Sequence, residues 1–127
     1  MSVVMPLAVA AGAAVGAPCR YLLDRAVQAR HQQSYPWGTL VINLLGSAVL
    51  GLLVGLAAGG LPPEVFAAAG TGWCGAFTTY STFGYETVRL AQDGYRWRAL
   101  AYVAISVSGG LALAAGGIAV GRALPGH

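Results

Sequence analysis

Four long apolar segments constrain this chain more than any other feature. They cover about residues 2–23, 38–61, 65–90 and 99–121 of the 127-residue sequence. A helix needs roughly 20 apolar residues to cross the hydrocarbon core of a bilayer, and each segment is at least that long. Only 9% of the residues are charged, whereas soluble domains carry roughly 25%. The sequence therefore predicts an all-α membrane protein with one four-helix transmembrane domain over residues 1–127.

The arginines predict how the chain lies in the membrane. The connections between the segments are short, so no separate soluble domain fits between them. The first and third connections, with the adjoining segment ends, hold Arg20, Arg25, Arg30, Arg89, Arg96 and Arg98. The opposite side holds only Arg122. Because positive loops stay in the cytoplasm, we expect a multi-pass protein of the plasma membrane with both termini outside.

The third segment has a composition that an ordinary membrane helix does not need. Three glycines lie within residues 70–75, and hydroxyl side chains fill residues 78–82. Glycine is a poor helix former, and Ser and Thr compete for backbone hydrogen bonds. At membrane depth such a segment is tolerated only where protein covers it or where it lines a polar path. The sequence therefore points to this segment as the functional one.

Polar residues of three segments are expected at a similar depth. Asn43 lies five residues into the second segment, and Tyr80 lies about sixteen residues into the third, counted from the opposite side. A helix rises ~1.5 Å per residue, so both belong to the same half of the membrane. The same half holds Ser81, Thr82, Phe83, Glu86 and, in the first segment, Arg20.

Each of these residues also has a plainer interpretation. Asn43 alone could form a hydrogen bond between helices, and Tyr80 and Phe83 could simply pack. Arg20 could extend to the membrane surface, and Glu86 could pair with Arg89.

The chemistry of the group favours an anion as its ligand. Its members are mainly hydrogen-bond donors and ring edges, and the midplane segments contain no carboxylate to serve a cation or a proton relay. Cys19 and Cys74 are far apart in the sequence and lack metal-ligand spacing. The sequence contains no plausible nucleophile–base pair of the kind that would indicate an enzyme. We therefore expect a membrane transport protein for a small anion.

Three motifs resemble those of the Fluc/CrcB fluoride channels. They are residues 75–83 followed by Glu86, residues 16–21, and residues 38–47. They occur in the family's order, and with the four segments the resemblance covers nearly the whole chain. The resemblance implies an antiparallel dimer with narrow pores that passes fluoride passively out of the cell.

The resemblance also implies roles for individual residues. It implies a third helix broken near its middle, with backbone carbonyls of Gly75 and Thr78 holding a structural sodium ion at the dimer interface. Asn43, Tyr80, Phe83, Ser81 and Thr82 would line the pore, and fourth-segment hydroxyls such as Ser106 or Ser108 would extend it. Arg20 would lie in the vestibule. Tyr80 departs from the phenylalanine that is commoner in the family at this position.

Two other classes of membrane protein share part of this pattern. A small multidrug-resistance-type exporter is also a compact four-helix dimer, but it needs a carboxylate deep in the first helix, and none precedes Asp24. A non-transporting assembly subunit would explain glycines spaced four apart, such as Gly12 and Gly16, but would not explain Asn43. The dimer partner is a second copy or an oppositely oriented paralogue. The arginine bias predicts a fixed orientation and thus favours the paralogue.

Overall fold

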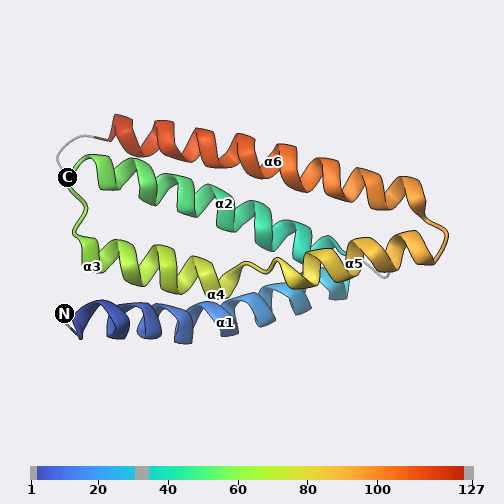
Figure 1. The fold of residues 1–127 in the computed structure, drawn as a ribbon, viewed down its shortest axis with the longest axis horizontal. Coiled ribbons are helices and arrows are strands. Elements are labelled where there is room, and N and C mark those ends of the chain that lie inside the picture. Colours follow the sequence, from blue (N-terminus) through green and yellow to red (C-terminus); the bar gives the residue numbers. More distant parts are fainter. Residues whose placement is uncertain (1–2, 31–34, 125–127) are drawn as a thin grey trace.

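The computed structural model describes residues 3–30 and 35–124 as long helical rods that run along one common axis (Figure 1). The predicted start of the first segment at residue 2 lies outside these residues. The elements are α1 (Val4–Arg30), α2 (Trp37–Ala58), α3 (Pro63–Phe66), η1 (Ala67–Cys74), α4 (Gly75–Phe77), α5 (Ser81–Gln92) and α6 (Arg96–Ala123).

Three of these helices are long and apolar enough to cross a membrane, namely α1, α2 and α6. The predicted third segment is instead divided into α3, η1, α4 and α5. The longest of these pieces is α5 with 12 residues, which is short of the roughly 20 needed to span the bilayer. The division follows the composition, because glycine and hydroxyl residues fill its middle.

The third segment changes its backbone geometry twice. After the single turn of α3, the chain continues as the π-helix η1 and then as the short α4. Helical geometry stops after Phe77, because Thr78 is extended, with φ −81° and ψ 161°. It resumes at Ser81, the first residue of α5.

Glycines let the rods approach at backbone distance. A side chain added at any of four glycines would collide with the backbone of the facing helix, on α2 at Gly51 and Gly55 and on α6 at Gly117 and Gly121. In the same way, a side chain added at Gly12 of α1 would collide with the backbone of η1, and one added at Gly72 of η1 would collide with the backbone of α1. The four-residue spacing that the sequence displays is therefore used inside one chain, where it joins α2 to α6 and α1 to η1.

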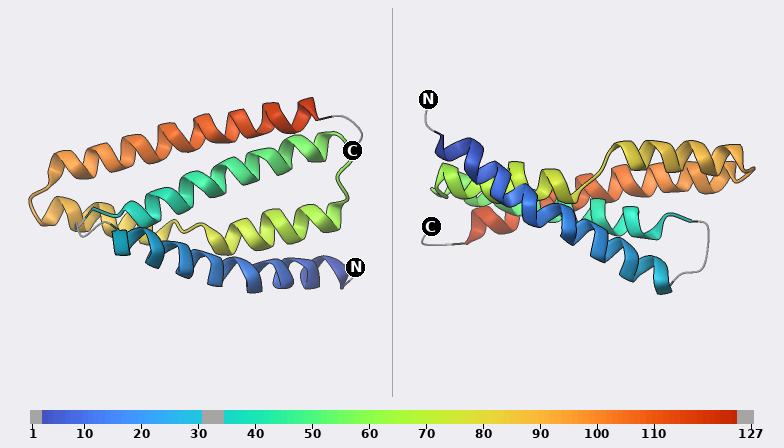
Figure 2. Two further views of the ribbon diagram at one scale, coloured as in Figure 1. Left: turned by 180° about the vertical axis from the view of Figure 1, so that it is seen from behind. Right: turned by 90° about the horizontal axis from the view of Figure 1, so that it is seen from below.

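The connections gather at two opposite ends. At one end lie the last residues of α1, the first residues of α2 and the α5–α6 turn (Figures 1 and 2). At the other end lie the α2–α3 turn, the start of α1 and the end of α6. The α5–α6 turn is closed by Gly94, whose φ of 89° suits glycine. At this end lies a buried cluster that includes Tyr35, Leu40, Leu90 and Tyr102.

Much of the apolar surface is not covered by any part of the chain that the structure describes. In the most apolar stretch of α6, 0% of the residues are buried, and in that of α1 the share is 6%. Large side chains such as Leu111 and Leu113 are exposed on α6. Lipid or another protein chain must cover this surface, because so large an apolar area is unfavourable in contact with water.

Candidate functional site

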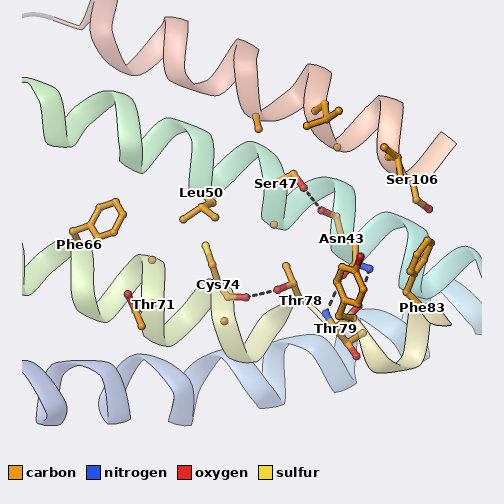
Figure 3. A pocket seen from close by; sticks show the side chains of 18 residues that line it. Asn43, Ser47, Leu50, Phe66, Thr71, Cys74, Thr78, Thr79, Phe83 and Ser106 are labelled. Atoms are coloured by element: carbon orange, nitrogen blue, oxygen red, sulfur yellow. Dashed lines mark hydrogen bonds between the residues drawn. The ribbon is translucent and has the colours of Figure 1, made fainter. Parts of the chain in front are cut away.

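Asn43 of α2 holds the interruption between α4 and α5 in place. Its amide Nδ2 donates to the carbonyl oxygen of Thr79 at 2.9 Å, and its Oδ1 accepts from the Thr79 backbone N–H at 3.0 Å (Figure 3). One side chain thus satisfies both backbone groups of a residue that has left the helix. Gly46, one turn further along α2, leaves room for the Thr78 side chain.

The interruption leaves several carbonyl oxygens without their usual donors, those of Gly75 and Thr78 among them. In an unbroken α-helix the Thr79 N–H would bond to the carbonyl of Gly75, but here it donates to Asn43. The Thr82 N–H would bond to the carbonyl of Thr78, but it donates to the Thr79 hydroxyl at 3.3 Å. The carbonyls of Gly75 and Thr78 thereby lose their helical partners. They are hard oxygen donors of the kind that alkali and alkaline-earth cations prefer.

Acidic or sulfur ligands do not compete for a cation there. Within the described parts of the chain, no group of three His, Cys, Asp or Glu residues could hold a metal ion. The hydroxyl of Thr78 is itself occupied, because it donates to the carbonyl of Cys74 at 2.8 Å.

An open groove of about 600 Å³ runs beside the interruption (Figure 3). Parts of α2, η1, α4 and α6 form its walls, and Tyr80 and Phe83 belong to its lining. Five residues with aliphatic hydroxyl groups are among its lining, namely Ser47, Thr71, Thr78, Thr79 and Ser106. The hydroxyls of Ser47 and Thr78 donate to the carbonyls of Asn43 and Cys74. None of the described residues that line it is charged. The groove can therefore offer hydrogen-bond donors to a solute without presenting a carboxylate.

Two aromatic rings, those of Tyr80 and Phe83, line the groove beside the interruption. The side chain of Tyr80 is 87% exposed, and its ring meets that of Phe83 edge-on, with 6.0 Å between the ring centroids. Phe83 is half-buried, and its ring packs against that of Tyr102, with 5.1 Å between the ring centroids. Ring edges carry partial positive charge, so this pair can contact an anion without a formal charge.

The predicted residues do not all lie in the groove. Its walls contain Asn43, Gly75, Thr78, Tyr80, Phe83 and Ser106. Ser81 and Thr82 are exposed in the first turn of α5, and Ser108 is exposed on α6, outside the lining. Arg20 is half-exposed on α1 and also lies outside the lining.

A buried polar cluster beyond Phe83 was not anticipated from the sequence. The side chain of Tyr102 is 0% exposed and that of Thr39 is 4% exposed, and both lie close to the carboxylate of Glu86. Glu86 Oε1 has no hydrogen-bond partner among the described residues. The ion pair of Arg89 is with Asp93, at 3.9 Å. Thr39 and Tyr102 carried no signal of their own, since a lone hydroxyl in an apolar segment is common.

Comparison with known proteins identifies the family. The CrcB-like protein family, described as Camphor Resistance (CrcB), matches residues 7–118. The chain belongs to the CrcB-like family. The matched range includes α2, the whole interrupted segment and the groove. Together with three helices that can cross a membrane, this membership makes the chain a multi-pass membrane protein.

Curated relatives of this CrcB-like chain carry one functional name. A protein of Frankia casuarinae named "Fluoride-specific ion channel FluC 1" is 53% identical, with 93% of this chain and 96% of the relative covered. "Fluoride-specific ion channel FluC 2" of Moorella thermoacetica is 49% identical over 85% and 88%. "Fluoride-specific ion channel FluC 1" of Leifsonia xyli subsp. xyli is 45% identical over 98% and 96%.

Proposed function

We propose that this chain forms a fluoride-selective ion channel that lowers cytoplasmic fluoride by passive efflux across the plasma membrane. The relatives reported above bear that function in their names. The chain is a channel subunit and not an enzyme, because its family is one of ion channels.

The observation that carries the proposal is the uncharged groove beside the helix interruption. Fluoride is small and strongly hydrated, so a pore must replace its water with close donors. The groove offers an amide, hydroxyl groups and aromatic rings, and its lining, as far as the structure describes the chain, holds no charged residue. A carboxylate there would repel the ion and bind cations instead.

Efflux from liposomes tests the proposal directly. Vesicles that contain the purified protein and are loaded with fluoride should release it when a potassium ionophore balances the charge. Vesicles loaded with chloride should retain their anion under the same conditions. Equal release of both anions, or no fluoride release from correctly assembled protein, would refute fluoride selectivity.

The pore assignment places five residues along the path. Asn43, Tyr80 and Phe83 belong to the groove, where they narrow the passage and supply a donor. The Asn43 amide nitrogen carries two hydrogens, and one is used by Thr79, so the second is the one offered to fluoride. Ser81 and Thr82 extend the hydroxyl path at the start of α5. Arg20 attracts the anion in the vestibule.

An antiparallel dimer would cover the open groove and the bare face of α6. A second copy is one candidate partner, and an oppositely oriented paralogue is the other. In a dimer the groove becomes a closed passage between chains, which a path for ions requires. Gly75 supports this arrangement, because a side chain built there meets nothing within 4 Å in the single chain.

Orientation decides between the two partners. Six arginines on one side against one on the other favour a single orientation. Cysteines introduced into the first connection should then react with an impermeant reagent from only one side of intact cells. Equal labelling from both sides, with this chain expressed alone, would instead support a homodimer of oppositely inserted copies.

A structural sodium ion at the dimer interface completes the proposal. The Gly75 and Thr78 carbonyls lack helical donors, and a two-fold axis beside them would double the set into a cage. The bound ion would supply positive charge near the anion path. Since main-chain atoms are the ligands, Thr78→Ser should be mild. Fluoride flux that is unaffected by long equilibration without sodium would count against the ion.

A further inference from the structure

A continuous series of aromatic rings links the α1–α2 connection to the groove. Tyr35 precedes α2, and its ring stands edge-on to Tyr102, with centroids 5.8 Å apart at an interplanar angle of 80°. The ring centroids of Tyr102 and Phe83 are 5.1 Å apart, and those of Phe83 and Tyr80 are 6.0 Å apart. The four rings come from three separate parts of the chain, so tertiary packing alone brings them together.

Tyr35 is fixed at the outer end of this series. Its side chain is 9% exposed, its ring contacts Trp37 with centroids 4.8 Å apart, and its carbonyl accepts from the Trp37 N–H at 2.9 Å. Tyr35 lies outside the groove and cannot touch a solute there. Tyr102, which is fully buried, is held between Tyr35 and Phe83.

We infer that Tyr35 is a positioning residue for the pore, which sets the orientation of the Phe83 ring through Tyr102. This inference rests on the proposed fluoride channel. Phe83 is half-buried and has the groove on one side, so its ring is free to turn unless packing on the other side prevents it. Tyr102 provides that packing, and Tyr35 closes the space into which Tyr102 would otherwise move. A turn of the Phe83 ring would change whether its positive edge or its negative face meets the path.

Fluorine NMR and transport together test the inference. The chain has three phenylalanines, so protein made with 4-fluorophenylalanine gives three signals, and Phe83→Leu identifies the signal of Phe83. Tyr35→Ala and Tyr35→Leu should shift or broaden that signal, while the signals of Phe66 and Phe77 stay unchanged. Tyr35→Phe keeps the ring. Its labelled form gives one additional signal from the introduced phenylalanine, and its other three signals and its flux ratio should match those of the parent protein.

The transport arm uses the same proteins in liposomes. We expect Tyr35→Leu to lower the fluoride-to-chloride flux ratio by about threefold or more, which is the scale of losing one aromatic pair. Leucine keeps more side-chain volume at position 35 than alanine does, so Tyr35→Leu serves the test if the alanine variant fails to fold. Leu90→Ala is the matched control, because Leu90 is buried in the same cluster but contributes no ring. It should keep the parent's signals and flux ratio.

Two results would overturn the inference. One is an unchanged Phe83 signal and flux ratio in folded Tyr35→Leu protein. The other is an equal change in the Leu90→Ala control, which would mean that general loosening of the cluster is the cause. If the parent protein conducts no fluoride, the proposed function fails, and the NMR arm still decides whether Tyr35 orients Phe83.

Discussion

Replacing Asn43 with Asp should impair the protein in two separable ways. The aspartate can still accept the Thr79 N–H, but its second oxygen would face the Thr79 carbonyl, to which the amide now donates at 2.9 Å. One hydrogen bond is lost, and two acceptors are left opposed. An unsatisfied buried group costs about 1–3 kcal/mol, and more when it is charged. The interruption between α4 and α5 should therefore be less stable.

The expected loss of transport is estimated from a free-energy cost of the same size, applied to the barrier for permeation. A change of about 1.4 kcal/mol is tenfold in rate, so we expect Asn43→Asp to lower fluoride efflux at least about tenfold. The introduced negative charge would add repulsion of the anion. Asn43→Leu removes both hydrogen bonds without a charge, and it should lower the unfolding temperature as well as the flux. Comparing the two variants separates the loss of the hydrogen bonds from the effect of charge.

Three measurements on each variant decide the matter, namely assembly in detergent, thermal unfolding and fluoride efflux from liposomes. Leu45→Ala is the control, because Leu45 is exposed two residues further along α2 and does not line the groove. It should behave like the parent protein. Asn43→Asp protein that folds, assembles and conducts fluoride at the parent rate would refute both roles assigned to Asn43.

Five further substitutions, one of them a control, test the rest of the structure. Phe83→Ile should lower fluoride efflux at least about tenfold, because the ring edge is lost, whereas Tyr80→Phe should stay active, because it keeps the ring. Gly75→Val should abolish assembly without unfolding the chain, and Gly116→Ala should be harmless in the same gel-filtration assay. Both glycines have open space in the single chain, so parent-like assembly of Gly75→Val would contradict an interface there. Gly72→Val should instead lower protein yield and thermal stability, since its side chain would strike the backbone of α1.

Much of the architecture could be predicted because hydrophobic length and charge are local properties. The placement of Asn43 and Tyr80 in the same half of the membrane needed only the helical rise and the direction of each segment. In the structure, Asn43 bonds to Thr79 beside Tyr80, as that estimate of depth requires. The arginine-rich ends likewise coincide at the end where the α5–α6 turn lies.

Other features could not be read from the sequence, because they depend on partners far along the chain. The sequence left open whether the Asn43 amide joins helices or faces a solute, and one hydrogen of that amide is used by a backbone 36 residues away. The contacts of Tyr35 with Tyr102 are set by packing between distant segments. The π-helical geometry of η1 carries no composition signal, because alanine and glycine fit α- and π-helices alike.

The π-helix also sets the rotational phase of everything that follows it. Each residue of an α-helix turns the chain by about 100°, and a π-helical turn accommodates an additional residue without breaking the rod. Deleting one residue from the alanines at the start of η1 would let the segment relax to α-helix, but it would also rotate Gly75 and Thr78 away from their present face. Gly72, wedged against α1, opposes such a rotation. The interruption thus faces the groove because of a phase that is set a full helical turn earlier.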